Sequence, residues 1–143
     1  KSFKVKYEIV PGITSGIGSA TYAGIPLTHR KYASSAVFVT GHEDPEKNEE
    51  IVKWKKLAKS VDTIVIMMGL SRIGIISKQL IAGGMKKSTP VAVIQNGTTP
   101  KQKMIVGTLT SIAGKIKKEK MTPPANIIIG EVVKLHKTIG WKK

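Results

Sequence analysis

The sequence contains no cysteine, so a disulfide framework and a zinc site built on thiolates are both excluded. Its apolar runs are short, such as residues 63–68, whereas a membrane-spanning helix needs about 20 apolar residues. The chain opens with an alternating, lysine-rich segment, which does not have the pattern of a signal peptide. We therefore expect a cytoplasmic protein with no membrane partner.

Acidic residues are also scarce, because nine of them stand against 24 basic residues and give a formal net charge of +15. Only Arg30 and Arg72 are arginines, so lysine carries most of this charge. Such an excess favours anionic partners, whether nucleic acid, anionic lipid or a polycarboxylate. A lysine-rich composition is also typical of heat-adapted proteins. Aromatic residues make up only 5% of the sequence and no RNA-binding signature is present, so nucleic acid is not the partner that we expect.

The length of 143 residues, with no internal repeat and no linker, predicts a single domain over residues 1–143. A hydrophobic fraction of 41% and a charged fraction of 23% are typical of a globular protein. Because the first residue is Lys1 rather than methionine, we expect this domain to be part of a longer polypeptide.

Hydrophobic patterning predicts an α/β fold, because segments typical of strands alternate with segments typical of helices. Alternating apolar residues predict a half-buried strand over 3–9. Further strands are predicted over 35–40, 62–68, 90–95, 103–107 and 126–129, and helices over 14–22, 46–59, 72–82 and 109–120. Thr14 or Ser15 is expected to cap the first helix. Only a loop joins the strands at 90–95 and 103–107, so we expect an antiparallel pair within a mixed sheet.

Three loops rich in glycine stand at the ends of predicted strands, at residues 11–15, 68–70 and 96–98. In open α/β sheets, ligands bind outside the carboxyl ends of the strands, and glycine lets a backbone approach a ligand closely. The alternative is that each glycine only forms a turn. The spacing from Gly12 to Gly18 does not fit a dinucleotide fingerprint, and the three histidines are too far apart in sequence to predict a metal site. These patterns alone therefore leave the ligand open.

The run VPGITS at 10–15 and the run YAGIPLTHR at 22–30 resemble the hallmark of the uroporphyrinogen-III C-methyltransferases, a group within the tetrapyrrole methylase family. Further motifs of that family follow in its order: TGH at 40–42, VIMMG at 65–69, TPVA at 89–92, NGT at 96–98, GTL at 107–109 and IGEVV at 129–133. The resemblance covers nearly the whole chain. It implies the C-terminal domain of the tetrapyrrole methylase fold, with a mixed five-stranded sheet flanked by helices.

The resemblance also implies a cofactor, S-adenosylmethionine, and a substrate, uroporphyrinogen III. Four matched positions fall on cofactor contacts in that family, namely Thr14, Ser15, Met68 and Gly97. Arg30 and His42 match positions that hold tetrapyrrole carboxylates. The implied reaction is methyl transfer to ring carbons that gives precorrin-2, for sirohaem or cobalamin biosynthesis. We expect Thr14, Met68 and Gly97 to meet along one rim.

The sequence departs from the family pattern in one large respect, because the family's G-A-G-P-G-D-P-like and G-G-D-P-like loops are not found in it. The suspected catalytic arginine and acid of the family belong with those loops, so no catalytic residue is expected in this chain. The implied partners are an N-terminal half of the same enzyme and a second copy in a homodimer. The isolated chain is expected to be inactive and to bind the cofactor weakly. A sibling methylase acting on another precorrin, or on a substrate that is not a tetrapyrrole, remains an alternative. A non-catalytic, basic domain that binds nucleic acid is the other alternative, and only the net charge supports it.

Overall fold

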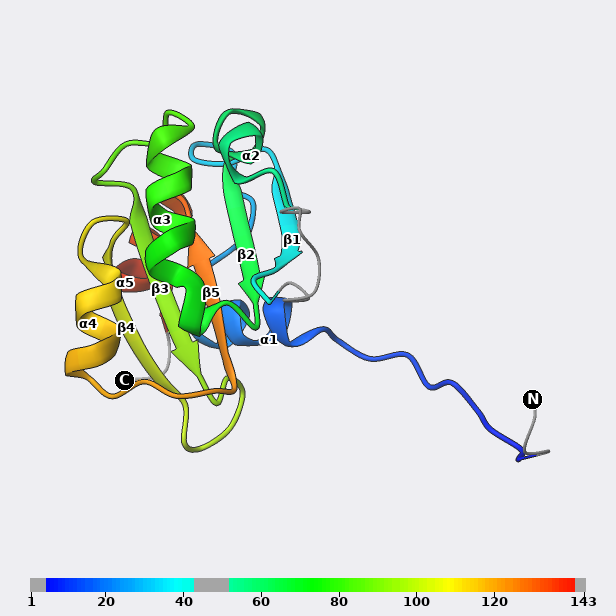
Figure 1. Cartoon of the computed structure of the whole chain (residues 1–143). Helices are drawn as coiled ribbons and strands as arrows, with labels where there is room; N and C mark the ends of the chain where they lie inside the picture. The colour runs from blue at the N-terminus through cyan, green and yellow to red at the C-terminus, as the bar shows by residue number, and fades with distance from the viewer. Residues whose placement is uncertain (1–4, 43–51, 141–143) are drawn as a thin grey trace.

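A mixed sheet of five strands forms the centre of the molecule, in a computed structural model that describes residues 5–42 and 52–140 (Figure 1). The strands are β1 (Ala36–Thr40), β2 (Thr63–Met67), β3 (Pro90–Gln95), β4 (Lys103–Thr108) and β5 (Ala125–Ile129). Their order across the sheet is β1-β2-β5-β3-β4. β1 and β2 are parallel, and the three other pairs of neighbours are antiparallel. The mixed sheet and the antiparallel pairing of β3 with β4 are therefore confirmed.

Helices cover both faces of this sheet. The helical elements are α1 (Ser15–Tyr22), α2 (Trp54–Ser60), η1 (Leu70–Arg72), α3 (Ile73–Ala82), α4 (Ile112–Lys118), η2 (Glu131–Leu135) and α5 (His136–Ile139). The helices α2, α3 and α4 share a core cluster with one face, and α1 and η2 share a second cluster with the other face. Since side chains alternate along a strand, Ile64 and Ile66 of β2 belong to the first cluster, whereas Val65 lies against Gly16 of α1.

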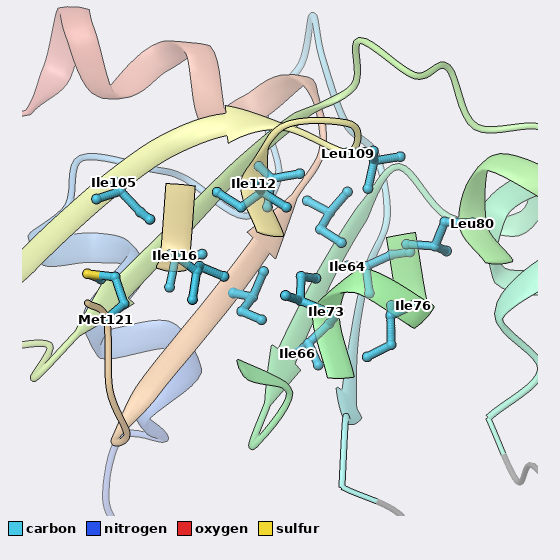
Figure 2. Packing of buried hydrophobic residues seen from close by; sticks show 14 of the residues in the cluster. Ile64, Ile66, Ile73, Ile76, Leu80, Ile105, Leu109, Ile112, Ile116 and Met121 are labelled. Atoms are coloured by element: carbon cyan, nitrogen blue, oxygen red, sulfur yellow. The ribbon is translucent and has the colours of Figure 1, made fainter. Parts of the chain in front are cut away.

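The larger core cluster consists mainly of isoleucine. Figure 2 shows the isoleucines of the helices pointing toward those of the strands: Ile73, Ile76, Ile112, Ile116, Ile64, Ile66 and Ile105. β2 is buried on both faces, as its continuous apolar run predicts for a central strand. This core fixes the directions of β2, β3 and β5, and so fixes where their ends meet.

Two predicted helices are shorter in the structure than in the sequence pattern. The helix predicted over 46–59 is observed from Trp54 to Ser60, with residues 46–51 lying outside the described residues. The helix predicted over 109–120 begins only at Ile112, because the hydroxyl of Ser111 accepts a hydrogen bond from the Thr108 N–H and holds 108–111 as a turn. After β5 the chain turns at Gly130 into η2. This position requires glycine, because a Cβ at residue 130 would lie 2.6 Å from the carbonyl oxygen of Asp62.

The strand predicted over 3–9 is wrong for residues 5–9, and residues 3–4 lie outside the described part of the chain. Residues 5–14 form an arm without regular structure, and Figure 1 shows this arm leading away from the sheet. Val5, Tyr7 and Ile9 are 72%, 75% and 82% exposed. Alternating apolar residues form a half-buried strand only where a neighbouring strand and a core face are available, and the described residues offer neither to this arm.

None of the helices in residues 5–42 and 52–140 has the length and apolar content that crossing a bilayer requires.

Candidate functional site

The ends of several strands meet at one edge of the sheet. In the register of the sheet, Thr40 of β1 lies beside Met67 of β2, Met67 beside Asn126 of β5, and Asn126 beside Ile94 of β3. Thr40 and Met67 are the last residues of β1 and β2, and Ile94 and Asn126 stand one residue from the end of β3 and the start of β5. The loops that follow Thr40, Met67 and Gln95 therefore leave the sheet at the same edge, which we call the loop edge.

The first turn of α1 is held against the loop edge by Asn126. The side-chain amide of Asn126 donates hydrogen bonds of 3.1 Å to the carbonyl oxygen of Ser15 and of 3.1 Å to the hydroxyl of Ser19. The Ser19 hydroxyl in turn donates to the Ser15 carbonyl oxygen at 2.6 Å. Asn126 is only 8% exposed, so these bonds are sheltered from water. They fix the start of α1 relative to β5.

Glycines allow the loops at this edge to touch their neighbours. A Cβ at Gly97 would lie 2.3 Å from the Cβ of Ser19, so the loop after β3 reaches α1 only because residue 97 has no side chain. A Cβ at Gly41 would lie 2.3 Å from the Cα of Gly69, which joins the loops after β1 and β2 in the same way. The glycines at 69 and 97, in two of the three predicted ligand loops, are therefore required by packing.

Two of these loops also contain residues with left-handed backbone angles. Met68 has a φ of 54°, and Asn96 and Thr98 have φ values of 49° and 69°. Such angles are uncommon for residues other than glycine, and they cluster at binding sites in many proteins. The conformation at Met68 leaves this residue 66% exposed at the loop edge, beside the partly buried end of β2.

A cleft of about 1370 Å³ opens along the loop edge. A typical small-molecule site has about 300–1,000 Å³, so this cleft has room for more than one small ligand. It runs from the start of α1, past the ends of the strands, to a groove between α3 and α4. Its walls include four of the six site residues predicted from the sequence: Ser15, His42, Met68 and Gly97.

Thr14, the fifth predicted site residue, stands next to this lining. It occupies the N-cap position of α1, where its carbonyl oxygen accepts hydrogen bonds from the N–H groups of Ile17 and Gly18. Its hydroxyl makes no capping bond and lies 4.0 Å from the sulfur of Met67. Thr14 therefore begins the helix as expected but does not cap it with its side chain. Thr14, Met68 and Gly97 lie along the same edge of the sheet.

Arg30 is the one predicted site residue that the structure does not bring to the cleft. Arg30 is exposed on the turn between His29 and Ala33, which precedes the first residue of β1. His42 follows the last residue of β1, at the other end of the strand. A strand of this length separates its two ends by about 13 Å. The sequence motif that contains Arg30 thus lies toward the edge of the sheet opposite to the loop edge.

The sequence analysis missed much of the cleft wall. It did not single out Ser19 and Asn126 at the α1 end, nor Met121 and Pro124 near the groove. Asn126 carries a usable signal, because it is an amide that precedes three isoleucines in a strand pattern and therefore needs a buried partner. The groove residues carry no such signal, since α3 and α4 come together only in the folded sheet.

The charge of the cleft is one-sided. The ionisable side chains among the described residues that line it are His42, Lys78 and Lys117, and none of the lining residues is acidic. No cluster of three histidine or acidic side chains suited to a metal ion is found within residues 5–42 and 52–140. The two lysines make the described lining suited to holding an anionic ligand.

Within residues 5–42 and 52–140, the carboxyl with a perturbed pKa lies away from the cleft. Asp62 precedes β2 at the opposite edge, where it accepts hydrogen bonds from the Ser34 N–H at 2.8 Å, the Ser35 N–H at 3.1 Å and the Ser35 hydroxyl at 3.0 Å. The bond from the Ser34 backbone, followed by that from the Ser35 hydroxyl, lowers the pKa of Asp62. This carboxylate ties the entry of β1 to that of β2 and has no part in the cleft.

Comparison with known sequences identifies relatives of one family. A sequence profile described as "Tetrapyrrole (Corrin/Porphyrin) Methylases" matches residues 2–113. The S-adenosyl-L-methionine-dependent uroporphyrinogen III methyltransferase of Methanosarcina barkeri is 46% identical over 140 residues, which are 98% of this chain and 55% of that protein. A siroheme synthase of Nitrosomonas eutropha is 48% identical over 138 residues, 96% of this chain and 29% of that protein.

Solved structures agree with this relationship. A cobalt precorrin-4 methyltransferase, described as a cobalamin biosynthetic enzyme, superposes with a TM-score of 0.79 at 27% identity over 88% of this chain and 52% of its own. The uroporphyrin-III C-methyltransferase of Thermus thermophilus, in complex with S-adenyl homocysteine, gives a TM-score of 0.75 at 32% identity over 94% of this chain and 54% of its own. This chain therefore spans about half the length of the methyltransferases that it matches.

Proposed function

Since this chain belongs to the tetrapyrrole (corrin/porphyrin) methylase family, we propose that it forms one wall of a methyltransferase site that holds S-adenosylmethionine against uroporphyrinogen III. The observation that carries the proposal is the convergence of three glycine-containing loops and the start of α1 on one cleft. The product would be precorrin-2, a precursor of sirohaem and of cobalamin.

The cleft fits the proposed cofactor in its chemistry. The hydroxyl of Ser15 and the backbone at Gly97 offer polar contacts for a zwitterionic amino acid, and Thr14 stands beside them. Met68 and Leu70 offer an apolar, adaptable wall for the flat adenosyl portion. When bound, the cofactor would supply the methyl group from its sulfonium centre.

The residues of this chain would contribute alignment to the reaction. Placing a ring carbon in line with the methyl group converts an encounter of two molecules into a single bound geometry, which is a large part of what catalysis requires. Among the described residues that line the cleft none is acidic, and His42 is the one histidine. We therefore propose that groups which move protons during the reaction come from polypeptide other than this chain.

A second wall is part of the proposal. The chain would act as the C-terminal domain of the enzyme, and an N-terminal half would cover the loop edge. Two observations support this: the matched methyltransferases are about twice as long as the chain, and Met68, at the proposed cofactor contact, is 66% exposed. The isolated chain is then expected to be inactive.

The substrate assignment rests on the relatives. Uroporphyrinogen III is the substrate named for the Methanosarcina protein at 46% identity, while the cobalt precorrin-4 enzyme is more distant at 27% identity. Methylation of another precorrin is therefore the alternative. His42 would contact a substrate carboxylate from within the cleft. Arg30 would contact a substrate carboxylate only if the substrate extends to the turn between His29 and Ala33, or if a second copy of the chain brings a substrate to that turn.

The remaining parts of the proposal concern the setting of the enzyme. A homodimer and a cytoplasmic location are proposed from the family resemblance. A link to cobalamin is supported by the description of the cobalt precorrin-4 methyltransferase as a cobalamin biosynthetic enzyme. Sedimentation equilibrium of the complete enzyme would test the dimer, and a single monomeric species would contradict it.

The proposed function can be tested with a chimera. This chain would replace the 140 matched residues of the Methanosarcina barkeri methyltransferase, and transfer of a radiolabelled methyl group to uroporphyrinogen III would be measured. We expect activity within about tenfold of the parent enzyme. Replacing Gly97 by valine in the chimera should abolish transfer, because the larger side chain would collide with Ser19. A folded chimera without activity would contradict the proposal.

A further inference from the structure

The groove between α3 and α4 is a part of the cleft to which neither the sequence motifs nor the proposed cofactor contacts assign a ligand. The two helices approach each other at small residues, since a Cβ at Gly74 would lie 3.8 Å from the Cβ of Ala113. Ile116 and Met121 line the groove on the side of α4, and Figure 2 shows both near the lower end of that helix. Ile75 lines it on the side of α3 and is 54% exposed. The groove is therefore apolar, with a buried floor at Ile116 and Met121 and an exposed wall at Ile75.

Two lysines flank this apolar surface from opposite helices. Lys78 lies on the α3 side of the cleft lining and Lys117 on the α4 side. The ion pairs found within residues 5–42 and 52–140 involve other lysines, Lys103 with Glu119 and Lys134 with Glu131. The described lining contains no acidic residue, so Lys78 and Lys117 have no anionic partner among the described residues of the groove.

An apolar floor between two cations matches one class of ligand. Apolar ligands without charge would leave both ammonium groups unused, and small hydrophilic anions would leave the floor uncovered. A flat macrocycle with carboxylates around its rim satisfies both requirements. The cofactor fits the groove less well, because it carries a single carboxylate and a positive sulfonium, which two nearby ammonium groups would repel.

We propose that Lys78 and Lys117 hold carboxylates of the tetrapyrrole substrate, with part of the macrocycle lying on the α3–α4 groove. This inference rests on the proposed function and adds two substrate-positioning residues to it. Each ammonium group would make an ion pair at the solvent-exposed rim, so the contribution of each is modest and weakens with salt. Lysine also lets its apolar stem cover the groove while its charge stays in water.

The test is titration of the chain with uroporphyrin, the stable oxidised form of the proposed substrate, followed by porphyrin fluorescence. Replacing both lysines by methionine, as Lys78→Met with Lys117→Met, retains the apolar stems and removes the charges. We expect the double variant to bind uroporphyrin about tenfold more weakly at low salt, as two exposed ion pairs would predict. The difference should shrink at high salt. Lys78→Arg with Lys117→Arg should restore most of the affinity.

Two comparisons separate this role from a general effect of charge. Lys86→Met with Lys137→Met removes two exposed lysines that do not line the cleft, and it should change the affinity by less than twofold. Coproporphyrin carries half as many carboxylates as uroporphyrin. The substitutions Lys78→Met with Lys117→Met should therefore lower the affinity for coproporphyrin by a smaller factor than the affinity for uroporphyrin. Circular dichroism would establish that every variant is folded.

Several outcomes would overturn the inference: no binding of uroporphyrin by the chain, equal affinity of the double variant and the parent chain, or an equal loss in the control variant. Binding of S-adenosylhomocysteine to the chimera should be unchanged by the two substitutions, and a matching loss there would assign the lysines to the cofactor. The proposed function and this inference can fail separately. An inactive chimera that still binds uroporphyrin through Lys78 and Lys117 would contradict the proposed function alone.

Discussion

Asn126 is the residue on which the geometry of the cleft depends most directly. It lies at the start of the central strand β5, and its amide reaches the carbonyl oxygen of Ser15 and the hydroxyl of Ser19 in α1. A buried amide in this position joins the sheet to the helix whose first turn lines the cleft. An apolar residue would satisfy the strand but would leave the first turn of α1 without this tie.

Replacing Asn126 by leucine should lower the free energy of unfolding by about 1–3 kcal/mol, because the Ser19 hydroxyl and the Ser15 carbonyl oxygen lose a donor away from water. Urea denaturation would measure the change. The control is Thr110→Val, which removes an exposed hydrogen bond to the Lys87 carbonyl oxygen and should change stability by less than about 0.5 kcal/mol. Equal effects of the two substitutions would contradict this role of Asn126.

Two glycines allow a matched comparison. At Gly97 an added methyl group would lie 2.3 Å from the Cβ of Ser19, so Gly97→Ala should lower the unfolding free energy by about 1–3 kcal/mol. Gly114 lies exposed within α4 with nothing within 4 Å of an added methyl group. There Gly114→Ala should stabilise the chain by about 0.5–1 kcal/mol, since alanine is the better helix former. Thermal unfolding of both variants tests the contrast, which similar shifts in the same direction would refute.

Asp62 gives the chain a predictable response to acid. Because hydrogen bonds from Ser34 and Ser35 lower its pKa in the folded state, the folded state binds a proton less readily than the unfolded state does. The stability from Asp62 is fully present above its ordinary value of 3.8 and is lost as the pH falls through the lower folded value. Asp62→Asn should therefore be less stable than the parent chain near neutral pH. The difference in unfolding free energy between the parent chain and the Asp62→Asn variant should narrow in acid. A difference that widens below pH 3.8 would contradict the stabilising role of the Asp62 carboxylate.

At the scale of helices and strands, local patterns predict elements that have partners. β2, β3 and β5 were predicted as apolar segments, because burial in the sheet enforces that pattern. α1 and α3 were predicted as helices that end at glycines. The arm was predicted wrongly, although its alternation is as regular as that of any strand. Alternation records what a segment would bury, and it carries no information about where the partner is.

The arm therefore should contribute nothing to the stability of the isolated chain. Ile9 is 82% exposed, so Ile9→Ala should change the free energy of unfolding by less than about 0.5 kcal/mol. Ile128 is fully buried between α1 and the sheet, and Ile128→Ala should lower it by about 2–5 kcal/mol. Chemical denaturation measures both values. A large effect at Ile9 would mean that the arm packs on the rest of the chain.

The site was predicted in part, for the same physical reason. The loop glycines and Met68 stand at strand ends that sequence patterns identify, and the register of the sheet then brings those ends together. The groove between α3 and α4 depends on β5 lying between β2 and β3, which no local pattern encodes. Arg30 shows that closeness in sequence does not place a residue at the cleft. Its motif follows Thr14 and Ser15 in the chain, but it leads toward the edge of the sheet opposite to the loop edge.

At the scale of the whole molecule, the cleft is a single wall. The proposed cofactor contacts lie along one edge of one sheet, and the exposed Met68 has no covering residue in the described part of the chain. A ligand bound there would remain in contact with water on one side. Electrostatic and apolar contacts are both weaker when water has access to them.

We therefore expect the isolated chain to bind S-adenosylhomocysteine more weakly than micromolar, and the chimera with the Methanosarcina segment to bind it at least about tenfold more tightly. Isothermal titration calorimetry of both proteins would measure this. Micromolar affinity of the isolated chain would show that a single wall is sufficient for the cofactor.

The position of β5 has a consequence for synthesis. Of the five strands in this sheet, the last in sequence joins the parallel pair β1–β2 to the hairpin β3–β4, since it hydrogen-bonds to β2 on one side and to β3 on the other. While the chain is still emerging from the ribosome, these two halves have no hydrogen bonds to each other and expose two edges to pairing with other nascent chains. Release of residues 125–129 from the exit tunnel is then the event that commits the whole sheet, and a ribosome that stalls before Ala125 would yield a product for chaperones or proteases.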